Sequence, residues 1–129
     1  MLLLEAKVEG RLKKLEGFGF EVFKLRTPGK SGAMDRMIQQ PRWSPAPPVV
    51  VEIKRPGHVE RALQEARRDD WRARGTDVRD MCDTYEKIDK LCDALLTEAV
   101  IRWSNAGSTP PLPQHIWTAY GAACKRIFK

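Results

Sequence analysis

The hydrophobic positions of this chain follow two periods, and segments of each kind alternate along the sequence. Apolar residues three or four positions apart, the spacing of one helix face, occupy residues 2–16, 59–74 and 84–103. Short alternating or continuous apolar runs, the pattern of strands, occupy residues 18–25, 35–39, 49–54 and, more weakly, 76–82. The order helix, strand, strand, strand, helix, strand, helix predicts an α/β domain of three layers, with a central sheet of about four strands flanked by helices.

Small and capping residues mark the ends of these segments. Gly17 and Gly75 follow the first two helical segments, where a glycine readily ends a helix. Thr84 is placed to cap the start of the third helix. Trp71 and Trp103 fall on helices, and we expect both in the core. The expected core face of the third helix consists of Ile88, Leu91, Leu95 and Ile101.

The composition changes after Asn105, where three prolines and several small residues follow one another. This change predicts a domain over residues 1–104 and a separate tail over residues 105–129. The tail is either a linker or a segment that lies on the surface, and its last residues, Ile116–Phe128, can form a short basic helix. Trp43, in the proline-rich loop 40–48, has three possible roles: stacking on an unpaired base, contact with a second subunit, or simple surface packing.

The charge and the cysteines narrow the class of protein. The 129 residues carry a formal charge of +6, which favours a polyanionic partner without proving one. Three widely spaced cysteines and two histidines form no zinc-binding pattern, so we expect reduced thiols in the cytosol. The apolar start Met1–Leu4 is too short for a signal peptide, and no run approaches the roughly 20 apolar residues of a membrane span. We expect a soluble protein.

The strand over residues 49–54 ends in two charged residues that its own stability does not require. Because strand side chains alternate, Glu52 and Lys54 point the same way while Ile53 points into the core. Asp35 begins the preceding strand after a glycine-bearing turn, and can meet Glu52 across neighbouring strands. Paired carboxylates beside an amine suit a hard divalent cation and a hydrolytic water. The alternative is a surface ion pair, since an acid two residues before a lysine also occurs at Glu5.

Together with residues on either side of them, these charged positions resemble a known family, the VRR-NUC domains of the PD-(D/E)xK nuclease superfamily. The matching residues are Lys24-Leu25, Gly32-Ala33-Met34-Asp35-Arg36, Val50-Val51-Glu52-Ile53-Lys54-Arg55-Pro56-Gly57, Gln64 and Gly75. The resemblance covers roughly residues 1–98 and implies a restriction-endonuclease-like fold. Met34 stands where the family usually has a proline, a position that shapes the backbone and binds no metal.

The resemblance also implies a role for each matching residue. Asp35 and Glu52 would be ligands of Mg²⁺ or Mn²⁺, with the backbone carbonyl of Ile53 completing the site. Lys54 would orient or deprotonate the attacking water. Glu5 matches the family's N-terminal acid, which reaches the metal directly or through water, and Gln64 matches the glutamine that lines the site.

Basic residues in the expected loops around Asp35 and Glu52 are candidate DNA contacts. These are Lys24, Arg26, Lys30, Arg36 and Arg55. The arginines of residues 59–74 either form a solvated face paired with nearby acids or follow the DNA phosphates. The sequence does not decide between these two interpretations.

The resemblance therefore implies a metal-dependent DNA endonuclease. The chain is similar to small stand-alone domains of bacteriophages and bacteria, some of which are homodimeric resolvases of four-way DNA junctions. This similarity implies a homodimer that acts on branched DNA in the cytoplasm of a bacterial or phage-infected cell. Two alternatives stay open: a flap or nicking nuclease of the same fold, and a DNA-binding module without catalytic activity.

Overall fold

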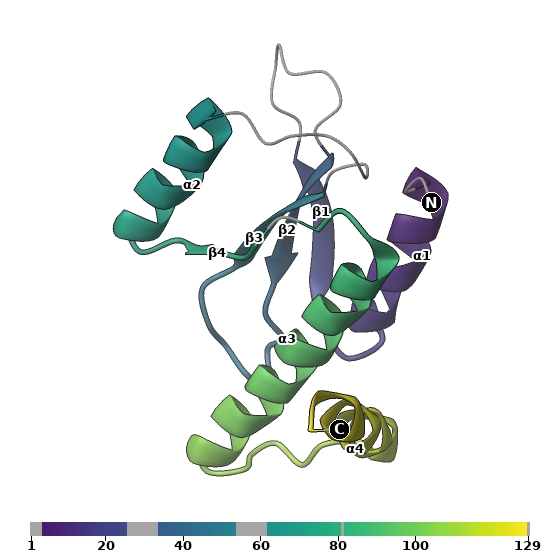
Figure 1. Cartoon of the computed structure of the whole chain (residues 1–129). Helices are drawn as coiled ribbons and strands as arrows, with labels where there is room; N and C mark the ends of the chain where they lie inside the picture. Colours follow the sequence, from purple (N-terminus) through teal and green to yellow (C-terminus); the bar gives the residue numbers. More distant parts are fainter. Residues whose placement is uncertain (1–3, 26–33, 54–61, 81, 129) are drawn as a thin grey trace.

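The computed structural model describes residues 4–25, 34–53, 62–80 and 82–128, with the backbone alone at residues 5, 34, 35 and 62–64. Four helices and four strands follow one another along the chain (Figure 1). In order they are α1 (Glu5–Glu16), β1 (Glu21–Leu25), β2 (Met34–Gln39), β3 (Val49–Ile53), α2 (Ala62–Ala73), β4 (Asp77–Val78), α3 (Tyr85–Asn105) and α4 (Gln114–Ile127). The expected order of elements is confirmed, and α4 is added at its end.

The strands form one mixed sheet in the order β1-β2-β3-β4. β2 runs antiparallel to both β1 and β3, whereas β4 runs parallel to β3. The segment after β4 stays beside β3, because the amide of Arg79 donates to the carbonyl of Val50 at 2.9 Å. This architecture confirms the predicted mixed α/β fold with a central sheet of four strands.

One face of the sheet is buried against α1 and α3. Val49, Val51 and Ile53 of β3 have no exposed surface, and the core position of Ile53 is the one that alternation predicted. The consecutive valines predicted burial on both faces, but Val50 is only half-buried, because the helices that cover the sheet here lie on the face of Val49 and Val51. They join one core cluster with residues of the two covering helices: Val8, Leu12 and Leu15 of α1, and Ile88, Leu91 and Leu95 of α3. In Figure 1, α1 and α3 lie on the same side of the sheet, whereas α2 stands apart at the β4 edge.

Two expectations about the core were wrong. Ile101 of α3 is 49% exposed and Trp71 of α2 is 38% exposed, whereas Trp103 is buried as expected. Ile101 lies on the outer side of α3 because the residues that face the core there are Ala99, Val100 and Trp103. Trp71 remains at the surface because α2 contacts the described chain mainly at the β4 edge, where Arg72 Nε donates to the carbonyl of Val78 at 2.9 Å.

The N-cap predicted for the long helix is confirmed. The hydroxyl of Thr84 accepts a hydrogen bond from the amide of Lys87 at 3.1 Å. This bond satisfies one of the amides at the helix start that have no partner within the helix. None of the helices in the described ranges has the length and apolar composition that a membrane crossing requires.

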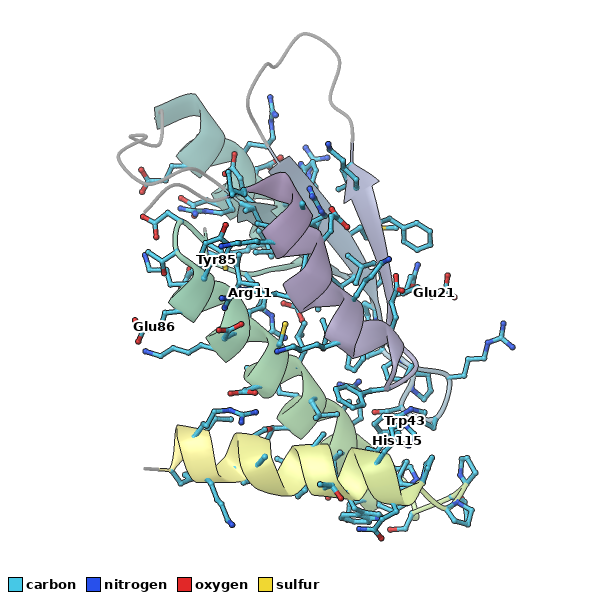
Figure 2. The ribbon with its side chains drawn as sticks, turned by 90° about the vertical axis from the view of Figure 1, so that its right-hand side faces the viewer. Arg11, Glu21, Trp43, Tyr85, Glu86 and His115 are labelled. Carbon is cyan, nitrogen blue, oxygen red and sulfur yellow. The ribbon has the colours of Figure 1, made fainter. Side chains whose placement is uncertain are left out.

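The segment after Asn105 packs against the preceding part of the chain, and its Leu112 and Ile116 join the core cluster. Its basic helix, α4, packs against α3, where Trp117 meets Trp103 edge to face. At the other end of α4, Arg126 forms two hydrogen bonds with Asp93 of α3. Figure 2 shows α4 lying across the end of α3, with the side chain of His115 at its start.

Trp43 packs against its own chain. It is half-buried, and its indole Nε1 donates to the carbonyl of Phe18 at 2.8 Å. The ring of Phe18 stacks on His115, whose Nε2 lies 2.8 Å from the carbonyl of Gly17. Figure 2 shows Trp43 and His115 close to each other. Of the three roles considered for Trp43, packing is the one that the structure shows.

The reactivity of two cysteines supplies a test of the fold. All three are free, and burial raises the pKa of Cys82 to about 11 and that of Cys92 to about 12. Because the thiolate is the reactive form, iodoacetamide at pH 8 should modify both residues at least ~100-fold more slowly than in the denatured chain. Peptide mapping by mass spectrometry over time measures both rates. Equal rates in the folded and denatured protein would contradict the burial of Cys82 beside β3 and of Cys92 on α3.

Candidate active site at the ends of β2 and β3

The two acids singled out by the sequence occupy opposed positions on adjacent strands. Asp35, near the start of β2, pairs with Glu52, near the end of β3. On its other side Asp35 pairs with Leu25, the last residue of β1. The row Leu25–Asp35–Glu52 therefore crosses the sheet at one end, where directly opposed residues have Cβ atoms about 4.5–5.5 Å apart.

The position of Glu52 is held by buried neighbours and by backbone pairing. Val51 and Ile53, on either side, have no exposed surface, and Glu52 itself is half-buried. The carbonyl of Glu52 accepts a hydrogen bond from the amide of Cys82 at 2.8 Å, and Ile53 forms a bridge with Cys82. The end of β3 is thus paired on both sides, so the acid stands on a rigid support.

The remaining candidates are placed only in part. Glu5 is the first residue of α1, and Gln64 lies in the first turn of α2, but their side chains are outside the described set. In both figures α1 begins at the end of the molecule where β2 starts and β3 stops. Four further candidates lie outside the described residues: Lys54, Arg26, Lys30 and Arg55.

Two of the proposed DNA contacts are described, and they differ sharply. Lys24 on β1 is exposed. Arg36 on β2 has no exposed surface and forms an ion pair with Glu9 of α1. A fully buried guanidinium offers no surface to a phosphate, so we remove Arg36 from the set of DNA contacts. Its position follows from alternation, because the residue after Asp35 on β2 must face α1.

The row of the two acids belongs to the face of the sheet opposite to α1 and α3. This face carries further residues that sequence reasoning missed. The register brings Phe23, Met37 and Val50 into a second row on this face, two residues along each strand from the first. Phe23 is 43% exposed, and Met37 and Val50 are half-buried. Figure 2 shows that Glu21, which shares this face, points away from α1. The alternation in β1 could have indicated these residues once the register was known.

The donor set fits a hard divalent cation. Carboxylates at two opposed positions supply oxygen ligands, and Mg²⁺ needs only one or two of them beside water and a substrate phosphate. Within the part of the chain that is described, no three His, Cys, Asp or Glu side chains cluster as a metal site would. Since the side chains of Asp35 and Glu5 are outside that part, the fit rests on the opposition of Asp35 and Glu52 in the sheet.

Comparison with known proteins supports the same assignment. No family model and no curated protein matches the chain. A solved structure described as a VRR_NUC domain is similar to it, with a TM-score of 0.51 and 28% sequence identity, over 67% of this chain and 91% of that one. With the sheet order and the opposed acids, this similarity supports a VRR-NUC domain assignment, that of a nuclease-type domain with a restriction-endonuclease-like fold.

Proposed function

We propose that this protein is a metal-dependent endonuclease that hydrolyses phosphodiester bonds of DNA, with a preference for branched substrates. The observation that carries the proposal is the opposition of Asp35 and Glu52 at the end of the sheet. Acids directly opposite each other destabilise a strand pair. A cation bound between the two acids would offset this repulsion, since Mg²⁺ takes carboxylate oxygens as ligands.

In this proposal Asp35 and Glu52 hold the cation, Mg²⁺ or Mn²⁺, together with the backbone carbonyl of Ile53. When bound, the cation would lower the pKa of a water and neutralise charge on the phosphate. Glu5 would contribute at the start of α1, directly or through water.

The proton and the substrate are handled by other residues of the chain. Lys54, two positions after Glu52 in the sequence, would orient the attacking water or accept its proton. Gln64 would help to position the phosphate from the first turn of α2. The exposed residue Lys24, on the edge strand β1, with Arg26, Lys30 and Arg55, would hold the DNA backbone, in keeping with the net charge of +6.

We further propose that two copies act together on a branched substrate. In a symmetric dimer a two-fold axis relates the two active sites. The two sites could then cut the two symmetry-related strands of a four-way DNA junction. A flap or nicking nuclease of the same fold would instead make single cuts. The free thiols of all three cysteines are compatible with action in the cytoplasm of a bacterial or phage-infected cell.

The experiment is a cleavage assay on a four-way junction, a flap, a nicked duplex and a plain duplex, each with Mg²⁺, Mn²⁺, Ca²⁺ or EDTA. We expect cuts with Mg²⁺ or Mn²⁺, none with EDTA, and faster cutting of the branched DNAs than of the duplex. Light scattering in solution checks the dimer. Intact DNA in all four substrates with both active metals would reject the nuclease proposal, and cleavage in EDTA would reject the metal.

A further inference from the structure

Phe23 is an exposed aromatic residue on the face of the sheet that α1 and α3 do not cover. The residue is 43% exposed on β1, an edge strand. It is paired with Met37, which is paired with Val50, so an apolar row runs from the edge strand to β3. Isolated exposed apolar residues are ordinary on protein surfaces. The position of this one relative to the two acids is what requires an explanation.

The apolar row lies next to the row of the acids. Phe23 is two residues before Leu25, which pairs with Asp35, so the two rows are about 7 Å apart along the strands. A stacked DNA strand rises ~3.4 Å for each nucleotide. A phosphate held at Asp35 and Glu52 therefore brings the bases within about two nucleotides of the cut to the level of Phe23.

We propose that Phe23 stacks on an unpaired base beside the scissile phosphate and thereby selects DNA in which such a base is exposed. This inference rests on the proposed function and names its substrate class. A phenyl ring has no hydrogen-bonding group, so it distinguishes bases from one another poorly. It can stack only on a base whose face is free, as at a junction, flap or gap, because in a duplex both faces are covered.

The size of the effect follows from known stacking energies. Stacking of one base on an aromatic side chain contributes about 1–3 kcal/mol, so loss of the ring should weaken binding about tenfold. The loss should be confined to DNA with an unpaired base near the cut. Duplex binding, which depends on phosphate contacts, should not change.

The test is a double-mutant cycle on binding, measured in Ca²⁺ or EDTA so that no cleavage is needed. Two flap DNAs are compared, which differ only in whether the unpaired nucleotide beside the branch carries a base or is abasic. The dissociation constant of each DNA is measured with the wild type and with Phe23→Ala. We expect removal of the base to weaken wild-type binding about tenfold and Phe23→Ala binding hardly at all. Phe23→Trp should restore the dependence on the base.

A control variant keeps the result specific to this position. Phe128→Ala removes an even more exposed phenyl ring, 79% exposed at the end of α4, and should keep the wild-type response. Equal, additive losses from Phe23→Ala and from the abasic site would overturn the inference. If wild type cuts no DNA but the cycle shows coupling, the nuclease proposal fails while the base contact stands, so the two failures are distinguishable.

Discussion

Glu52→Gln is expected to abolish DNA cleavage while the protein becomes no less stable. The change keeps the shape of the side chain and removes the charge that would hold the cation opposite Asp35. Loss of such a ligand costs several kcal/mol of transition-state stabilisation, which corresponds to a rate at least ~10³-fold lower. Because opposed acids repel each other, removal of one charge should leave the free energy of unfolding unchanged or raise it by up to ~1 kcal/mol. Single-turnover cleavage and urea denaturation measure the two effects.

A matched control shares the same face of the sheet. Glu21 is an exposed acid of β1 that pairs with Gln39, so it opposes an amide and takes no part in the proposed site. Glu21→Gln should therefore cleave at the wild-type rate. Asp35→Asn should behave like Glu52→Gln. Full cleavage by Glu52→Gln would contradict the role of the opposed acids, and an unfolded Glu52→Gln protein would contradict their repulsion.

The position of the acids could be predicted because it depends on local patterns. Continuous valines fixed β3, and alternation then set Glu52 on the face opposite to Val51. The turn expected before Asp35 and the loop after Gln39 leave few ways to pair two short antiparallel strands. The register that opposes Asp35 and Glu52 follows from these features, together with the requirement that apolar residues share the buried face.

The interpretations that failed depend on contacts between distant parts of the chain. The burial of Arg36 requires Glu9 of α1, which is 27 positions earlier in the sequence. The exposure of Trp71 reflects how little of α2 touches the sheet, and no periodicity within a helix shows what will cover it. The place of α4, which the sequence left open, also depends on distant pairs such as Arg126 and Asp93. Helical period identifies a face but not its partner.

Arg36→Ala is expected to lower the free energy of unfolding by about 3 kcal/mol. The arginine side chain has no exposed surface, and its guanidinium joins β2 to α1 through Glu9. Truncation would leave a cavity beneath α1 and remove the packing of the aliphatic stem, which typically costs 2–5 kcal/mol, as in other large-to-small changes. Arg36→Met fills most of the volume without a charge and should cost less than ~1.5 kcal/mol, since buried ion pairs are replaced well by apolar residues.

A variant of Glu9, the partner of Arg36, separates the contribution of packing from that of charge. Glu9→Gln removes the same ion pair but leaves a buried guanidinium without that carboxylate, so it should destabilise the protein more than Arg36→Met does. Urea denaturation of the three variants gives the order. Because Arg36 faces α1 and not the row of the acids, Arg36→Met should still bind and cleave DNA at the wild-type level. If Arg36→Ala is within ~0.5 kcal/mol of the stability of the wild type and loses DNA binding, the burial of Arg36 is contradicted. Arg36 would then again be a candidate DNA contact.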